Sequence, residues 1–377
     1  MSYRLPFRTS LVGGLLACAV ALTGCGVGAP SAATAGGGST ATAAKCGTMK
    51  SKMIKFVDNT FQTLWINNAI AEYIITNGFC YPTQSETIST AVGQETIANG
   101  QTDVWMELWQ NNIISWYDKV IKAGQLVNLG NTYDASSQGW YVPKYMISGD
   151  AARGIKATAP GLTSVTQLSQ YWQDFQDPHN HSKGLFINCI TSWQCSRENN
   201  IRLQAYGLTK YFDTQEPGTA PALDAAIVGA YTKGQPFLAY YWAPTWLLGK
   251  YDLVQLKQPA YTDACNAEIQ KALDGKVTVS QVTSAAGCAY DSFSVQKGVN
   301  AGLLKSAPAV VAFLRKMDVG NGPLQKTAAY MAANQATAAQ AAQYFFENYQ
   351  GEWEGWLPAD VALRVKNALI ASGAKLA

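Results

Sequence analysis

The sequence is poor in histidine, in charged residues and in long apolar runs. Its two histidines, His179 and His181, leave little material for histidine-based catalysis or a multi-histidine metal site. Charged residues make up 14% of the 377 residues, against roughly 25% in an average soluble domain. The formal net charge of +3 excludes the basic footprint typical of nucleic-acid binding. A hydrophobic content of 48% excludes intrinsic disorder for the body of the chain.

The N-terminal segment is typical of an export signal. Arg4 and Arg8 precede the apolar stretch 11–22, and small residues follow up to Cys25. The apolar stretch is too short to span a bilayer, which takes about 20 residues. The ending Leu-Thr-Gly-Cys resembles a bacterial lipobox, which predicts a signal peptide over 1–24 and lipidation of Cys25. The alternative is an ordinary signal peptide that happens to contain a cysteine.

Residues 25–45 are mostly small and predict a flexible tether. No apolar run beyond the signal reaches 18 residues. We therefore expect a water-soluble body held by its lipid on the periplasmic or extracellular side of the cell membrane.

Six further cysteines suggest disulfides, because an even number is common in exported chains. Six cysteines allow 15 connectivities. Proximity in the sequence favours the pairs Cys46–Cys80, Cys189–Cys195 and Cys265–Cys288. A zinc site is the rival interpretation, and it is weak because no Cys-x2-Cys pair occurs.

Apolar periodicity predicts an α/β fold with a mostly parallel sheet. The N-terminal part alternates short strands with helices, and the C-terminal third is helical. The predicted strands are 54–57, 104–109, 140–142, 185–189 and 237–242, and the predicted helices are 65–76, 85–99, 196–208, 224–232, 308–317, 324–349 and 359–372.

The strand 104–109 carries an unusual face. Because side chains alternate along a strand, Trp105, Glu107 and Trp109 point to one side of it. A carboxylate between two indoles is unusual on the core-facing side of a strand. The plainer alternative is that both tryptophans pack under a helix and Glu107 meets a lysine.

Three other segments place aromatic rings beside glycine, proline or cysteine. Trp140 and Tyr141 follow Gly139, Trp193 lies between Cys189 and Cys195, and Trp242 ends a predicted strand. Open α/β sheets bind ligands at the carboxyl ends of their strands. Rigid indoles at that edge suit a cation, which the ring face attracts.

The segment after Trp193 adds an anion site. Gln194 and Cys195 stand at the N-terminus of the predicted helix 196–208, and N–H groups at such a point are unpaired and bind carboxylates or phosphates. Rings for a cation beside N–H groups for an anion describe a site for a small zwitterion.

These segments resemble the substrate-binding lipoproteins of ABC importers for glycine betaine, proline betaine, choline and related quaternary amines. The matching pieces are Asp103–Trp109, Gly139–Pro143, Cys189–Cys195 and Tyr241–Trp246, in family order. The resemblance implies a two-lobed periplasmic-binding fold of type II with two crossover segments. One lobe would hold residues 46–140 and 246–377, and the other residues 141–245.

The resemblance also implies site residues and partners. Trp109, Trp193 and Trp242 would form an aromatic cage, with Phe61 as a further ring. The backbone N–H groups of Gln194 and Cys195 would hold a ligand carboxylate, and Trp140 and Tyr141 are further candidates. The partners would be a small methylated amine and the subunits of an ABC permease, with no cofactor, metal, nucleic acid or catalytic residue.

The sequence departs from the family at one end of the site. Some betaine binders place a histidine shortly after the position of Trp109, and residues 110–113 contain none. Glu107 instead adds a negative charge, which favours a cation, or trimethylamine N-oxide if Glu107 is protonated. The identity of the amine stays open.

Two other functions are compatible with parts of the sequence. A secreted carbohydrate-active enzyme or sugar-binding lipoprotein could use tryptophan platforms, but Asp103 and Glu107 on one strand would lie about 13 Å apart, too far for a carboxylate pair. A surface adhesion protein would use exposed rings to contact a partner. His179 and His181 lie in a polar run that reads as a solvated turn, with a weak metal-binding loop as the alternative.

Overall fold

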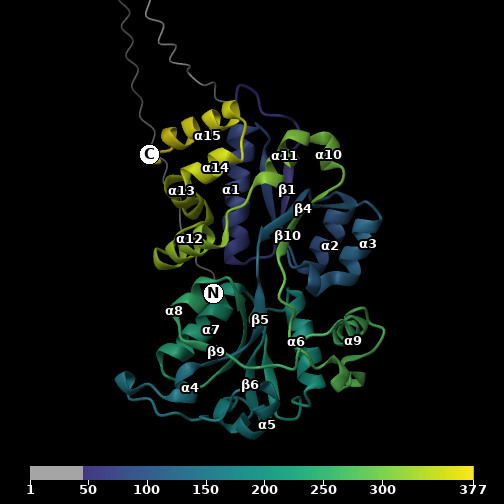
Figure 1. Ribbon diagram of the computed structural model, residues 1–377, viewed down its shortest axis with the longest axis vertical. Coiled ribbons are helices and arrows are strands. Elements are labelled where there is room, and N and C mark those ends of the chain that lie inside the picture. The colour runs from purple at the N-terminus through teal and green to yellow at the C-terminus, as the bar shows by residue number, and fades with distance from the viewer. Residues whose placement is uncertain (1–45, 377) are drawn as a thin grey trace, which may run out of the picture. The chain divides into compact units, whose positions relative to one another are not determined.

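The computed structural model describes residues 46–376, which form two α/β lobes (Figure 1). Each lobe is built on one five-stranded sheet within that range. The predicted signal peptide, Cys25 and most of the tether lie outside the described residues. The two-lobed α/β fold expected from the sequence is confirmed.

The first sheet has the strand order β2-β1-β3-β10-β4. Strands β1, β2 and β3 run parallel, and β10 lies antiparallel between β3 and β4. Their bounds are β1 Ile54–Asp58, β2 Thr83–Thr87, β3 Val104–Leu108, β4 Leu126–Tyr133 and β10 Val295–Asn300.

The second sheet has the order β7-β6-β8-β5-β9, with β5 antiparallel to both of its neighbours. The bounds are β5 Ser137–Pro143, β6 Gly184–Ile187, β7 Phe212–Gln215, β8 Leu238–Ala243 and β9 Leu253–Gln255. Strand β6 is buried along most of its length, as its apolar sequence predicts.

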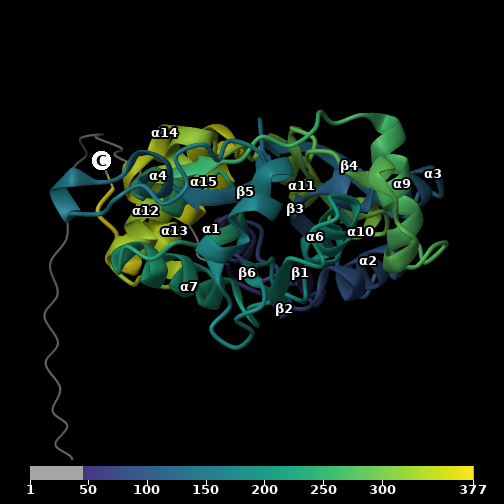
Figure 2. The ribbon, with the colours of Figure 1, turned by 90° about the horizontal axis from the view of Figure 1, so that it is seen from below.

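Helices of the first lobe pack around α1, whose core side chains include Leu64, Ile70 and Ile74. Figures 1 and 2 show α12, α13 and α15 gathered beside α1. The bounds are α1 Gln62–Gly78, α2 Thr90–Asn99, η1 Gln110–Ile113, α3 Ile114–Lys122, α10 Leu303–Ser306, α11 Pro308–Lys316, α12 Asn321–Ala333, α13 Ala338–Asn348, α14 Gln350–Gly355 and α15 Ala359–Ala371.

In the second lobe, α6 packs against α9 (Figure 2). The two helices share a small core with the Cys265–Cys288 disulfide. The bounds are α4 Lys144–Ser148, η2 Ala151–Arg153, η3 Val165–Gln167, α5 Leu168–Tyr171, η4 Trp172–Phe175, α6 Gln194–Ala205, α7 Ala220–Thr232, α8 Trp246–Lys250, α9 Asp263–Leu273, η5 Val279–Gln281 and η6 Ser284–Ala286.

The chain passes between the two sheets twice, over residues 134–136 and 291–294. The crossovers lie side by side, because the backbone N–H and the hydroxyl of Ser136 both donate to the carbonyl of Phe293, at 2.9 and 2.6 Å. The Ser292 hydroxyl donates back to the carbonyl of Ser136 at 2.9 Å. Two short segments that connect the lobes and are hydrogen-bonded to each other are suited to act as a hinge.

The second crossover comes later than the sequence indicated. The expected division returned the chain to the first lobe at residue 246, but β9 pairs with β5 in the second sheet. Helix α9 and the Cys265–Cys288 disulfide also stay with α6. Strand β9 pairs with β5 more than a hundred residues earlier, and a local sequence pattern cannot predict such a long-range contact.

Two predicted helices also differ. Residues 85–87 of the expected helix 85–99 belong to the edge strand β2, and the helix begins only after Ser89, whose hydroxyl caps it. The expected helix 324–349 divides into α12 and α13. Thr337 and Gln340 form a capping box there, satisfying N–H groups that begin a new helix.

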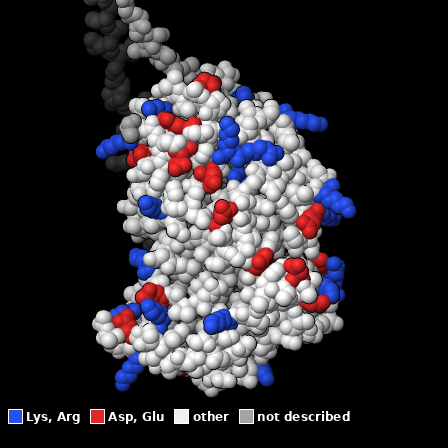
Figure 3. Space-filling model, in the orientation of Figure 1, with Lys and Arg blue, Asp and Glu red and all other residues white. Residues whose placement is uncertain are grey.

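The three predicted disulfides form. Cys46 is bonded to Cys80, Cys189 to Cys195 and Cys265 to Cys288. No helix among residues 46–376 is long and apolar enough to cross a membrane. Charged side chains are sparse and of mixed sign on the face drawn in Figure 3, in keeping with the composition.

The Cys265–Cys288 bond offers a test of this lobe. Replacing both cysteines by serine should lower the free energy of unfolding by about 3 kcal/mol, because the bond closes a loop with a sequence separation of 23. Denaturant unfolding of the double variant measures the change. A loss below about 1 kcal/mol would show that α9 and the segment after it are held by packing alone.

Candidate functional site

A cavity lies between the two sheets and takes its lining from both lobes. Its volume is about 60 Å³, which suits a ligand of a few heavy atoms. The lining residues are Asn59, Phe61, Thr90, Trp105, Glu107, Trp109, Asn112, Ile113, Gln138, Trp193, Gln194, Cys195, Tyr240 and Trp242.

Three of the lining rings stand nearly perpendicular to one another. Phe61 and Trp193 meet at 86° with centroids 5.4 Å apart, and Trp193 and Trp242 at 86° and 5.1 Å. Phe61 and Trp242 meet at 81° and 6.4 Å. We call these three residues the aromatic box. Each ring is more than 90% buried, so the rings are held rigidly.

Local structure fixes each ring of the box. Phe61 is the N-cap of α1 and follows β1, whereas Trp193 is the N-cap of α6 and follows β6. The Trp193 indole N–H donates to the carbonyl of Asn59 at 2.5 Å, which joins the two lobes. Trp242 lies in β8 and stacks on Tyr240 with centroids 6.3 Å apart.

Trp109 lines the same cavity but stands apart from the box. It follows β3 and packs against Tyr133 and Phe293, with ring centroids 6.3 and 5.9 Å away. It also hydrogen-bonds Glu107. The structure therefore places Trp109, Trp193 and Trp242 in the lining of one cavity, but only Trp193 and Trp242 share the aromatic box, together with Phe61.

Glu107 is a buried carboxyl group in the cavity wall. It accepts hydrogen bonds from Asn67 at 2.9 Å and from Thr63 and Tyr133 at 3.1 Å each. These bonds and that of Trp109 lower its pKa, but burial outweighs them and raises the pKa to about 7. Near neutral pH the group is therefore present in both its protonated and its ionised form. The alternative in which Glu107 pairs with a lysine is wrong.

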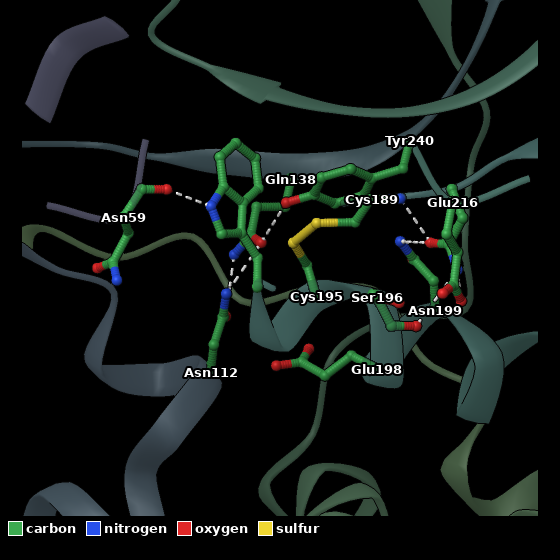
Figure 4. Close-up of a disulfide and its surroundings, with 12 residues drawn as sticks. Asn59, Asn112, Gln138, Cys189, Cys195, Ser196, Glu198, Asn199, Glu216 and Tyr240 are labelled. Atoms are coloured by element: carbon green, nitrogen blue, oxygen red, sulfur yellow. Dashed lines mark hydrogen bonds between the residues drawn. A yellow bond between two sulfur atoms is a disulfide. The ribbon is translucent and has the colours of Figure 1, made fainter. Parts of the chain in front are cut away.

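The start of α6 brings backbone donors to the cavity. Gln194 and Cys195 are its first two residues, whose N–H groups have no acceptor inside the helix. The bond from Cys195 to Cys189 holds this helix end against the loop after β6 (Figure 4). The N-terminal end of the helix also carries positive potential, so it favours an electronegative ligand atom.

Two predicted site residues lie elsewhere. Trp140 is fully buried against Phe186, and its indole N–H donates to Asn199 at 2.7 Å. It stands two residues beyond Gln138 on β5, about 7 Å further along the strand and under α6. Tyr141 points to the opposite face of β5 and donates to Gln255 at 3.2 Å. Both side chains build the second lobe instead of lining the cavity.

Several lining residues were not singled out from the sequence. Alternation along β8 from Trp242 indicates Tyr240, and Gln138 directly precedes Gly139 of the aromatic segment 139–143. Asn112 occupies the loop after Trp109 that lacks a histidine. Asn59, Thr90 and Ile113 carry no sequence signal, because their place depends on how the lobes meet.

The two histidines lie in a polar loop of the second lobe. Asp177 accepts the backbone N–H of His179 at 2.7 Å, a turn bond in an exposed loop. Among residues 46–376, no group of three His, Cys, Asp or Glu side chains is placed to hold a metal ion.

Solved structures share the fold. A glycine betaine and L-proline binding protein of Borrelia burgdorferi superposes with a TM-score of 0.64 at 16% identity, covering 83% of this chain and all of that one. The lactococcal OpuAC in its closed form with glycine betaine gives 0.60 at 17% identity, covering 81% of this chain and all of that one.

Two proteins with similar sequences are named for the ligands that they bind. The chain is 24% identical over 261 residues to a trimethylamine N-oxide-binding protein of Pelagibacter ubique, which covers 69% of this chain and 76% of the relative. It is 24% identical over 216 residues to the glycine betaine-binding periplasmic protein OusX of Dickeya dadantii, covering 56% and 60%.

A family model settles the class of protein. Residues 52–348 match the substrate-binding domain of the ABC-type glycine betaine transport system. Members of this family are extracytoplasmic solute-binding proteins that work with an ABC permease, which excludes the carbohydrate-active enzyme considered from the sequence. Since the match spans most of the chain, the chain belongs to the family of substrate-binding domains of ABC-type glycine betaine transport systems.

Proposed function

We propose that this protein is a lipid-anchored receptor that captures a small trimethylated amine, in the first place trimethylamine N-oxide, and delivers it to an ABC permease. The anchor would be Cys25, at the end of the predicted signal peptide. The observation that carries the proposal is the aromatic box with Glu107 in the same small cavity.

The box suits a trimethylammonium group. Its methyl hydrogens spread the positive charge and donate no ordinary hydrogen bonds, so a binding site needs ring faces rather than polar acceptors. The faces of Phe61, Trp193 and Trp242 supply cation–π attraction and apolar burial on the same surface.

Glu107 favours the N-oxide among the methylated amines. Protonated Glu107 can donate to the oxygen of an N-oxide, and a pKa of about 7 makes that form available. Ionised Glu107 repels the carboxylate of glycine betaine and attracts choline, which is a permanent cation. The small cavity also favours the smaller ligand. The first N–H groups of α6 then add positive potential for the same oxygen.

Replacing a ring of the box should weaken binding. Trp193→Ala or Trp242→Ala should cost about 1–3 kcal/mol, or roughly 5- to 150-fold in affinity for trimethylamine N-oxide. A phenylalanine at either position should cost less, because an apolar face remains. Calorimetric titration measures both effects.

Trp140→Ala is the matched control, since Trp140 is a buried tryptophan outside the cavity. It should lower the free energy of unfolding by about 3–5 kcal/mol and leave the affinity of the folded protein unchanged. If both box variants bind as tightly as the parent, the box does not hold the ligand.

The protonation state of Glu107 predicts opposite pH trends for two ligands. Affinity for trimethylamine N-oxide should fall as the pH rises from 6 to 8, because Glu107 loses the proton it donates. Affinity for choline should rise over the same range. Glu107→Gln keeps a neutral donor, so it should retain binding of the N-oxide and flatten its pH profile. A flat profile in the parent would remove Glu107 from the mechanism.

The same carboxyl group predicts how stability depends on pH. Because its folded-state pKa is raised from 4.5 to about 7, the folded protein holds this proton more tightly than the unfolded chain does. Glu107 therefore favours the folded state below pH 4.5, and that contribution is lost as the pH rises toward 7. Melting temperatures between pH 4.5 and 8 should decline less steeply in Glu107→Gln than in the parent. An unchanged slope would contradict the raised pKa.

A further inference from the structure

Three polar side chains in the cavity wall form one hydrogen-bonded unit, which we call the amide bridge: Asn112, Gln138 and Tyr240. Asn112 Nδ2 donates to Gln138 Oε1 at 3.1 Å, and Gln138 Nε2 donates back to Asn112 Oδ1 at 3.0 Å. The Tyr240 hydroxyl donates to the same Gln138 Oε1 at 2.7 Å. Figure 4 shows the three side chains meeting beside the Cys189–Cys195 disulfide.

The amide bridge joins the two lobes at their hinge. Asn112 belongs to η1 of the first lobe, and Tyr240 to β8 of the second. Gln138 stands at the start of β5, two residues after the crossover 134–136. The Asn112–Gln138 pair therefore links a side chain of the first lobe to the first strand of the second.

The bridge also connects two tryptophans that come from different lobes. The backbone N–H of Asn112 donates to the main-chain carbonyl of Trp109 at 3.0 Å, so η1 is joined to the backbone that carries that ring. At the other end, Tyr240 stacks on Trp242. A continuous set of contacts thus runs from Trp109 through Asn112, Gln138 and Tyr240 to Trp242.

Gln138 itself is fixed by its surroundings. Its backbone carbonyl accepts from Gln255 Nε2 at 3.0 Å. That side chain crosses the neighbouring Gly139 so closely that a Cβ atom there would stand 2.2 Å from it. Glycine at position 139 therefore allows Gln255 to hold β5 in place, and the Gln138 amide is presented to Asn112 from a rigid strand.

The two amides are occupied with each other. Each carbonyl oxygen of the pair accepts a hydrogen bond, and each amide nitrogen donates one across the pair. The pair is also nearly buried, with Asn112 9% and Gln138 3% exposed. Losing one partner would leave buried polar groups unsatisfied, which makes the closed arrangement sensitive to this contact.

We propose that the amide bridge positions the two halves of the cavity: it holds the lobes closed over the ligand and sets the distance between Trp109 and Trp242. Asn112 and Gln138 are positioning residues that govern how long a ligand stays bound and how large it can be. The role in ligand retention rests on the function proposed above, whereas the role in lobe closure does not.

Two further bonds join the lobes and do not replace the bridge. The backbone N–H of Thr90 donates to the carbonyl of Ser192 at 3.0 Å, and Trp193 donates to the carbonyl of Asn59. In both bonds the acceptor is a main-chain carbonyl oxygen, which a side-chain substitution does not remove. Among residues 46–376, the amide bridge is the hydrogen-bonded contact between the lobes in which side chains form both ends, so substitution can remove it selectively.

The test uses Asn112→Ala and Gln138→Ala, singly and together. Stopped-flow tryptophan fluorescence should show trimethylamine N-oxide dissociating about 5- to 30-fold faster from each single variant, with association within twofold of the parent. The double variant should lose less than the sum of the two, because both changes remove one contact. The preference for trimethylamine N-oxide over the larger glycine betaine should also shrink.

Asn300→Ala is the matched control. Asn300 is an amide of the first lobe that bonds the carbonyl of Ile97 at 2.7 Å and the backbone N–H of Gly302 at 2.8 Å. Its loss should lower the melting temperature without changing dissociation. Unchanged dissociation from a folded Asn112→Ala variant would overturn the proposal for ligand retention.

Small-angle X-ray scattering tests closure without any ligand. The radius of gyration of ligand-free Asn112→Ala should exceed that of the parent and of Asn300→Ala, because open lobes scatter as a more extended body. Equal radii would refute the closure role. If neither amine binds the parent protein, the proposed ligand class fails, and the scattering result still decides the role of the bridge in closure.

Discussion

Neither lobe contains the whole of the candidate site. Phe61, Trp109 and Glu107 belong to the first lobe, whereas Trp193, Trp242 and the start of α6 belong to the second. The two lobes must come together before three rings can surround one group. This constraint explains why the hinge, the capping positions of α1 and α6 and the short disulfide loop all converge on one small volume.

The chemistry of the cavity follows from burial. A carboxyl group in water is ionised at neutral pH, but at Glu107 the loss of hydration exceeds the effect of its hydrogen-bond donors. The polar edge of each of two tryptophans is already hydrogen-bonded within the protein, that of Trp193 to Asn59 and that of Trp109 to Glu107. Only the ring faces are therefore left to contact a ligand. Apolar rings and a carboxyl group that is only partly ionised near neutral pH thus line one small cavity.

The sequence predicts the parts of this site that depend on local pattern. Alternation in β3 brings Glu107 and Trp109 to one face, and the disulfide pairs follow from proximity. It misplaces Trp140 and Tyr141, because nothing local shows how far along β5 the cavity reaches. It also misses Asn112, Gln138 and Tyr240, which acquire their role only when residues 26 and 102 positions apart meet.

The position of β10 has a consequence for how the exported chain folds. Strand β10 is the sole neighbour of β4 in the first sheet and lies between it and β3, yet it follows the whole second lobe in sequence. During synthesis, β4 therefore has no partner until residues 295–300 have emerged, and its open edge is a site for wrong pairing. The second lobe, from β5 to the Cys265–Cys288 bond, is a continuous stretch and can form first. The first sheet is thus begun by β1 at residue 54 and can be completed only by β10, after the whole second lobe has passed in the sequence.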